Sequence, residues 1–186
     1  MGRRTLGFLA AAVAAAVLAG AASAAPQTRS ADVHVWATNV CTSLKTWQHS
    51  LQRRSKAVSA TKPSNIGELH DRFAAFLVAV VKDTDMLIVR TKAAGTPSVS
   101  NGAAIEKALV TGFTKLRTYF AADAVKAKRL SRTDASQFAA GAAAIGDLID
   151  RQASKVTSTF DTLDKKYRST SLDKVMRGTS ACKGIG

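Results

Sequence analysis

The two cysteines are the residues of this chain whose chemistry is easiest to anticipate. Cys41 and Cys182 are the only cysteines among its 186 residues. The chain also begins with a segment typical of exported proteins, which is described below. Because exported proteins fold where disulfides form and persist, we expect the two thiols to pair. A redox-active pair would have a Cys-x-x-Cys spacing, which is absent. The sequence therefore predicts a structural disulfide.

The spacing of histidines and carboxylates does not favour a metal site or an active site. His34, His49 and His70 lie too far apart to form pairs at helical spacing, and the Glu-x-x-His motif of di-iron bundles is absent. The chain also lacks a haem-attachment motif, a nucleophile elbow and a phosphate-binding glycine loop. Asp147 and Asp150 are three residues apart and therefore neighbours on a helix, and the simplest interpretation is that both lie on a solvent-exposed face. We predict no metal, no cofactor and no enzymatic activity, with spatially assembled carboxylates as the open alternative.

Positive charge is the second chemical feature. Lysine and arginine number 27 against 13 acidic residues, which gives a net charge of +14 at pH 7. A surplus of this size favours an anionic partner, such as a cell-envelope polymer or a membrane surface. DNA is a weak fit, because the chain is predicted to be exported and has no aromatic residues interleaved with its basic ones. We therefore expect no nucleic-acid partner.

The first 24 residues are predicted to be a cleaved secretory signal peptide. Arg3 and Arg4 precede an apolar run, and the small residues of 22–24 form a cleavage site. The apolar run is short and alanine-rich for a membrane span, so an uncleaved anchor is the less favoured alternative. The mature chain, residues 25–186, is then expected to be a soluble, extracytoplasmic protein with a single helical-bundle domain and no transmembrane helix.

The mature chain is rich in alanine and poor in proline and glycine, which predicts an all-α fold. We expect four helices of roughly 25 to 30 residues, separated by breaks at 61–64, after Gly95 and at 131–133. Short breaks favour an up-down-up-down four-helix bundle. A short last helical turn is expected to start near Ser171, before the tail that carries Cys182.

The first predicted helix, residues 31–59, carries a single apolar stripe, with Ser30 as its N-cap. The stripe recurs at alternating steps of four and three residues: Val33, Ala37, Val40, Leu44, Trp47, Leu51 and Val58. Trp47 is therefore predicted to lie in the core, and Trp36 on the flank of the stripe, partly exposed. Capping pairs also mark two later helices, namely Asn65 with Glu68 and Asp134 with Gln137.

The predicted topology gathers eight basic residues at one end, because the first and third helices both end there. We call this set the basic pole. It consists of Arg53, Arg54, Lys56, Lys62, Lys126, Lys128, Arg129 and Arg132. The helix macrodipole favours cations at helix C-termini without any partner. Eight cations, with Glu68, Asp71 and Asp134 as the nearby acids, exceed that need, and the pole is therefore a candidate anion-binding surface.

Three segments of the sequence suggest a resemblance. VCTSLKTWQHSL, GTPSVSNG between two helices and the terminal ACKGIG resemble segments of small exported helical proteins and lipoproteins of high-GC actinobacteria. The resemblance covers nearly the whole mature chain. The chain departs from the lipoprotein members at Ala21, where they carry the lipidated cysteine. The resemblance implies a cell-envelope context and supplies no catalytic residues.

Two functional hypotheses follow from the sequence. The first is a non-enzymatic, disulfide-stapled bundle that binds anionic envelope polymers or headgroups through the basic pole. The alternative is an apolar small-molecule carrier or sensor. Its pocket would lie between the phenylalanine-rich second and third helices and the small residues AAGAAAIG of the fourth. Close helix approach is the simpler explanation of those small residues.

Overall fold

A computed structural model describes residues 30–60, 62–166 and 170–184; the predicted signal peptide, residues 1–24, lies outside them. The helices are α1 (Val33–Ser59), α2 (Ile66–Ala93), α3 (Gly102–Ala127), α4 (Ala135–Lys166) and α5 (Thr170–Gly178), followed by a 3-10 turn, η1 (Ser180–Cys182). Two short strands, β1 (Ser30–Ala31) and β2 (Thr96–Pro97), pair in parallel. The all-α prediction is confirmed, since the strands hold only two residues each.

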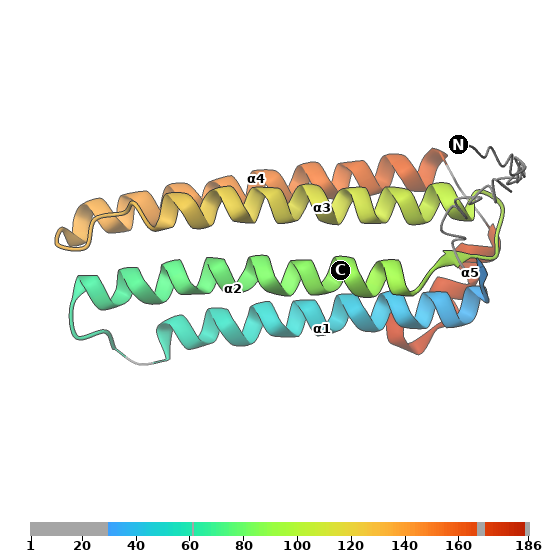
Figure 1. Ribbon diagram of the computed structural model, residues 1–186, viewed down its shortest axis with the longest axis horizontal. Helices are drawn as coiled ribbons and strands as arrows, with labels where there is room; N and C mark the ends of the chain where they lie inside the picture. The colour runs from blue at the N-terminus through green and yellow to red at the C-terminus, as the bar shows by residue number, and fades with distance from the viewer. Residues whose placement is uncertain (1–29, 61, 167–169, 185–186) are drawn as a thin grey trace, which may run out of the picture.

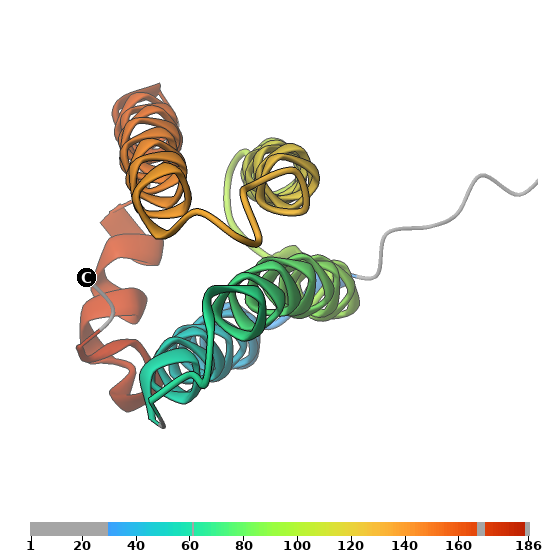
Figure 2. The ribbon, with the colours of Figure 1, turned by 90° about the vertical axis from the view of Figure 1, so that its left-hand side faces the viewer.

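The four long helices run in alternating directions along one common axis (Figure 1). α2 packs against both α1 and α3, and α3 packs against α4. In the described part of the chain no comparable packing joins α1 to α4. Instead α5 and η1 pack on α1, and the end view places α5 on the side between α4 and α1 (Figure 2).

The caps predicted for α2 and α4 are confirmed. The Asn65 side chain accepts a hydrogen bond from the Glu68 backbone N–H at 2.9 Å, and Asp134 accepts one from Gln137 at 2.9 Å. The cap predicted for α1 is wrong. Asp32, not Ser30, accepts hydrogen bonds from the first-turn N–H groups, because Ser30 belongs to β1. Local capping chemistry thus starts each of these helices.

The prediction that Trp36 is partly exposed is also wrong. Its side chain is only 2% exposed, and its Nε1 donates a hydrogen bond to the Gly95 carbonyl at 2.9 Å. The connection between α2 and α3 folds over the start of α1. It covers the side of α1 next to the apolar stripe, where Trp36 lies. Trp47 is half-buried and donates to the Thr84 hydroxyl at 3.1 Å.

Two glycines allow the α2–α3 connection to close over Trp36. Gly95 has a φ of 76°, a left-handed conformation that other residues adopt at a cost. At Gly102 a β-carbon would lie 2.0 Å from the Pro97 carbonyl oxygen, so any side chain there would displace the connection. Pairing of β1 with β2, together with the bond from the Ser98 N–H to the Ala31 carbonyl, fixes the connection to the start of α1.

Candidate binding site at the basic pole

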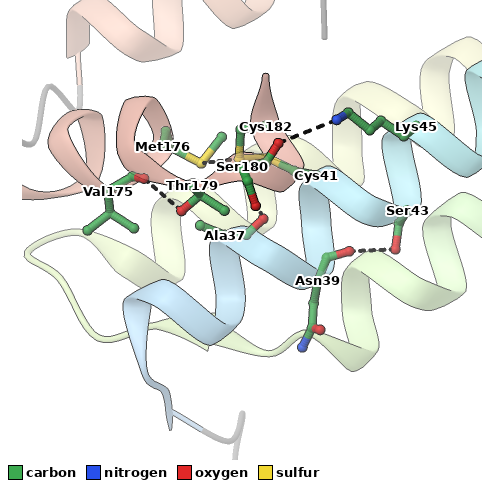
Figure 3. Close-up of a disulfide and its surroundings, with 10 residues drawn as sticks. All are labelled: Ala37, Asn39, Cys41, Ser43, Lys45, Val175, Met176, Thr179, Ser180 and Cys182. Carbon is green, nitrogen blue, oxygen red and sulfur yellow. Dashed lines mark hydrogen bonds between the residues drawn. A yellow bond between two sulfur atoms is a disulfide. The ribbon is translucent and has the colours of Figure 1, made fainter. Parts of the chain in front are cut away.

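The predicted disulfide is present. Cys41 of α1 and Cys182 of η1 are bonded across a sequence separation of 141 residues (Figure 3). The sulfur of Cys182 lies 3.8 Å from the Ala37 carbonyl oxygen, and Lys45 donates to the Ser180 carbonyl at 3.5 Å. The C-terminal segment is therefore fixed along α1, at the end of the molecule opposite the basic pole (Figures 1 and 3).

The residues of the basic pole lie at one end of the helices, where the α1–α2 and α3–α4 connections meet (Figure 1). One ion pair joins the α3–α4 connection to the start of α2. The Arg132 guanidinium donates to both carboxylate oxygens of Asp71, at 2.8 Å for the bond to Oδ2. His70, which is buried, places its Nδ1 3.0 Å from Asp71 and 3.2 Å from Arg132. The Arg132 hydrogen bonds and then His70 lower the pKa of Asp71.

A second ion pair crosses between α1 and α2. The Arg54 Nε and Nη2 atoms donate to the two oxygens of Asp83 at 2.5 and 3.0 Å, and the Ser50 hydroxyl donates to the same carboxylate at 2.6 Å. Donation by Arg54, followed by that of Ser50, holds the pKa of Asp83 below its usual value, and the pair raises the pKa of Arg54. Arg54 therefore serves the contact between the helices.

This ion pair predicts how stability responds to acid. A carboxyl group whose pKa is lowered by folding adds stability above its unfolded value, about 3.8 for Asp83, and loses it as pH falls through the lower folded value. We expect the stability advantage of the wild-type protein over Asp83→Asn to shrink as pH falls below that value. Urea unfolding of both proteins across the acidic pH range measures this difference in the free energy of unfolding. An advantage that stays constant with pH would contradict the prediction.

Lys126 is paired with a buried acid that the sequence did not reveal. Asp123 is 0% exposed, and one of its oxygens accepts a hydrogen bond from the Lys126 ammonium at 3.0 Å. Its other oxygen accepts no hydrogen bond from the described residues. Removing Lys126 would leave a buried charge without its counterion, which is strongly destabilising. Lys126 is therefore a structural residue and is unsuitable for a binding test.

The other residues of the pole face solvent. Arg53, Lys62, Lys128 and Arg129 are exposed, and none of the four forms an ion pair within the described residues. Lys56 is also exposed, in the last turn of α1. The pole thus contains three cations paired with acids of the fold, Arg54, Lys126 and Arg132, and four exposed cations, Arg53, Lys62, Lys128 and Arg129, that form no ion pair within the described residues.

Exposed cations are not confined to this end. The opposite end carries several, on α2, α3, α4 and α5: Arg90, Lys92, Lys107, Lys165 and Lys174. Any test of the pole must therefore separate its position from the net charge of the protein. The lysines among these residues provide the matched control.

The described residues hold no group of three or more metal-ligating side chains, and none of the described helices is both long and apolar enough to cross a membrane. Among the small residues of α4, Gly141 is closely packed, whereas a β-carbon at Gly146 would meet nothing within 4 Å. The rings of Phe73 and Phe138 meet edge to face with centroids 6.1 Å apart. A β-carbon at Gly141 would lie 2.4 Å from a methyl group of Leu130. The carrier hypothesis stays a prediction.

No protein-family model, curated protein or solved structure matches this chain. The geometry and charge of its own residues are therefore the basis for inferring its function.

Proposed function

We propose that this protein is an exported, non-catalytic binding protein whose four long helices form an up-down-up-down bundle. Its solvent-facing basic pole would bind an anionic polymer or headgroup of the cell envelope. The observation that carries the proposal is that Arg53, Lys62, Lys128 and Arg129 are exposed cations that form no ion pair among the described residues. Cations packed at one end repel each other, and a polyanion relieves that repulsion.

Two further features support an extracytoplasmic protein. The Cys41–Cys182 disulfide is typical of chains that fold in oxidising compartments. The N-terminal sequence has the charge, apolar run and small residues of a secretory signal. An envelope is rich in phosphate- and carboxylate-bearing polymers, which suit a basic protein.

Charge reversal tests the pole. We expect a variant with Arg53→Glu, Lys62→Glu, Lys128→Glu and Arg129→Glu to lose retention on anionic vesicles or on poly(glycerol phosphate) at low salt. Wild-type retention should weaken steeply with added salt, because exposed charges are screened over about 10 Å at 0.1 M. Co-sedimentation with vesicles, or elution from immobilised polymer, measures the effect. The unfolding transition should change little, since exposed substitutions are usually worth within about 0.5 kcal/mol each.

The matched control reverses four cations of the opposite end: Lys92, Lys107, Lys165 and Lys174. Loss of binding in the pole variant alone supports the proposal. Equal loss in both variants would assign the effect to net charge. If the wild-type protein retains no polyanion at low salt, the proposed function is wrong.

A further inference from the structure

The outer flank of the α1–α2 pair carries three hollows that follow one another along the seam between the helices. Their volumes are about 330, 130 and 270 Å³, in order from the disulfide end to the basic pole. The first two hollows share Ser43 and Arg90 in their walls. The ion pair between Arg54 and Asp83 connects the second to the third. We call the three together the seam groove.

Helical periodicity explains why the hollows are aligned. The wall from α1 includes a row formed by Asn39, Ser43, Thr46, Ser50, Arg53 and Ala57. The wall from α2 includes a row formed by Arg72, Phe76, Ala79, Asp83, Met86 and Arg90. Both sets recur at alternating steps of three and four residues, so each set occupies one face of its helix. The α1 residues that meet the C-terminal segment, such as Cys41 and Leu44, lie on a different face.

The charged residues of the seam groove are mostly arginines. Four arginines line it, against the single acid Asp83, and no lysine lines these three hollows in the described part of the chain. Arg54 is paired with Asp83, and Arg72 with Glu68. Arg53 and Arg90 are exposed and form no ion pair among the described residues. A guanidinium offers a planar fork of donors that suits phosphate and carboxylate groups.

The arginines are spread along the groove. Arg90 lines the hollow that includes Thr42 and Ser43, whereas Arg72 lines the one that includes Ala57 and Val58. Along the axis of α1, these two hollows are separated by about 15 residues, or about 22 Å at 1.5 Å per residue. A single small anion reaches only one or two of these groups. Arg53 and Arg90 both line the middle hollow, and Arg54 and Arg72 line the hollow at the pole end, so the row of arginines suits a long ligand that carries repeated negative charges.

The walls between the arginines are of mixed polarity. Ser43, Thr46 and Ser50 place hydroxyl groups in the middle section, and Ala57 and Phe76 provide apolar surface at the pole end. The middle section also contains Trp47, Met86 and Leu87, but its hydroxyl groups and its charged side chains interrupt the continuous apolar stripe that a docked amphipathic helix would need. The three hydroxyl groups donate within the fold, so their oxygens can accept hydrogen bonds from the hydroxyl groups of a polar chain.

We propose that the seam groove binds a linear polyol phosphate along the length of the α1–α2 pair, with Arg53 and Arg90 each holding a phosphate. This inference rests on the proposed function, because it names the ligand class and the path of the ligand beyond the pole. It also makes a distinct claim. Arg90, at the end opposite the pole, belongs to the seam groove, whereas Lys128 and Arg129 of the pole lie outside the groove.

The sharpest test compares two charge reversals on one turn of α2. Arg90 lines the groove, while Lys92, two residues further along and about 200° around the helix, points away from it. With poly(glycerol phosphate) as the probe, we expect Arg90→Glu to weaken binding roughly tenfold or more. It should also lower the slope of log K against log salt by about one. Lys92→Glu should bind nearly as the wild type does. Titration calorimetry of the disulfide-bonded protein measures both variants.

A third variant separates this inference from the proposed function. Lys128→Glu with Arg129→Glu changes the pole but not the groove. Loss of binding in Arg90→Glu supports the groove whether or not the double variant also loses binding, because the double variant reports on the pole alone. Retention in Arg90→Glu with loss in the double variant overturns the groove and leaves the pole standing, and equal losses in Arg90→Glu and Lys92→Glu also overturn the groove. Polymer that fails to bind the wild type overturns both.

Monomeric glycerol phosphate and an acidic amphipathic peptide complete the design. The monomer should bind far more weakly than the polymer, because it engages a single arginine. Equal affinity per phosphate would overturn the linear mode. A peptide that binds in an Arg90-dependent way while the polymer does not would assign the groove to a protein partner. Unchanged thermal unfolding of each variant shows that its fold is intact.

Discussion

Replacing Trp36 with alanine is expected to lower the free energy of unfolding by about 3–5 kcal/mol, the range for large-to-small changes of buried aromatic residues. Its side chain is buried at the centre of a cluster with Ala37, Val40, Ala94 and Val175. The cluster joins α1, the end of α2 and α5, so the cavity would loosen three elements at once. Urea unfolding of the oxidised protein, followed by circular dichroism, measures the change.

A conservative variant separates packing from hydrogen bonding at this site. Trp36→Phe keeps most of the apolar contact but leaves the Gly95 carbonyl without its indole donor. We expect it to cost about 1–3 kcal/mol, the penalty for a buried polar group that loses its partner. A cost below about 1 kcal/mol for Trp36→Ala would mean that the α2–α3 connection does not depend on this side chain.

Loss of the Cys41–Cys182 disulfide is expected to have an effect of similar size. In the chain-entropy model, closing a loop with a separation of 141 residues stabilises the folded state by up to about 5 kcal/mol at 25 °C. Reduction, or the Cys41→Ala and Cys182→Ala double variant, should therefore lower the melting temperature markedly. Calorimetry of the oxidised and reduced protein measures the change.

Thiol titration and a reductant control complete this test. Oxidised, folded protein should contain no titratable thiol, and reductant should leave the melting temperature of the double variant unchanged. Two free thiols in folded material from an oxidising medium would contradict the disulfide. A double variant as stable as the wild type would show that packing of α5 and η1 on α1 suffices without it.

The helices themselves could be predicted from the sequence because their signals are local. Asn65 and Asp134 cap helices through bonds to residues three positions away. Apolar spacing identified α1 without knowledge of its neighbours. The cysteine pairing needed only the even count and an exported chain. The sequence also placed the basic pole at the meeting point of two connections, because short breaks force neighbouring helices to run antiparallel.

The features that sequence reasoning missed depend on contacts between distant residues. Trp36 is buried because a connection 59 residues further along folds over it. Asp123 follows Phe120 on the inward side of α3, and no local pattern distinguishes it from a surface acid. Arg54 was assigned to a binding surface, yet Asp83 of α2 holds it. The seam groove exists only where the faces of two helices meet.

The contacts that join distant parts of the sequence lie mostly at one end of the molecule, and this has a consequence for how the chain folds. Each long helix packs mainly on its neighbour in sequence, so the three helical hairpins can form quickly and locally. The β1–β2 pair and the Cys41–Cys182 bond need the whole chain in place, and loop closure makes them the last to form. With two cysteines there is no mispaired isomer within one chain. An oxidant that acts before folding is complete can therefore form a wrong disulfide only between two chains, through any of three cysteine combinations, and covalent dimers are the signature of premature oxidation.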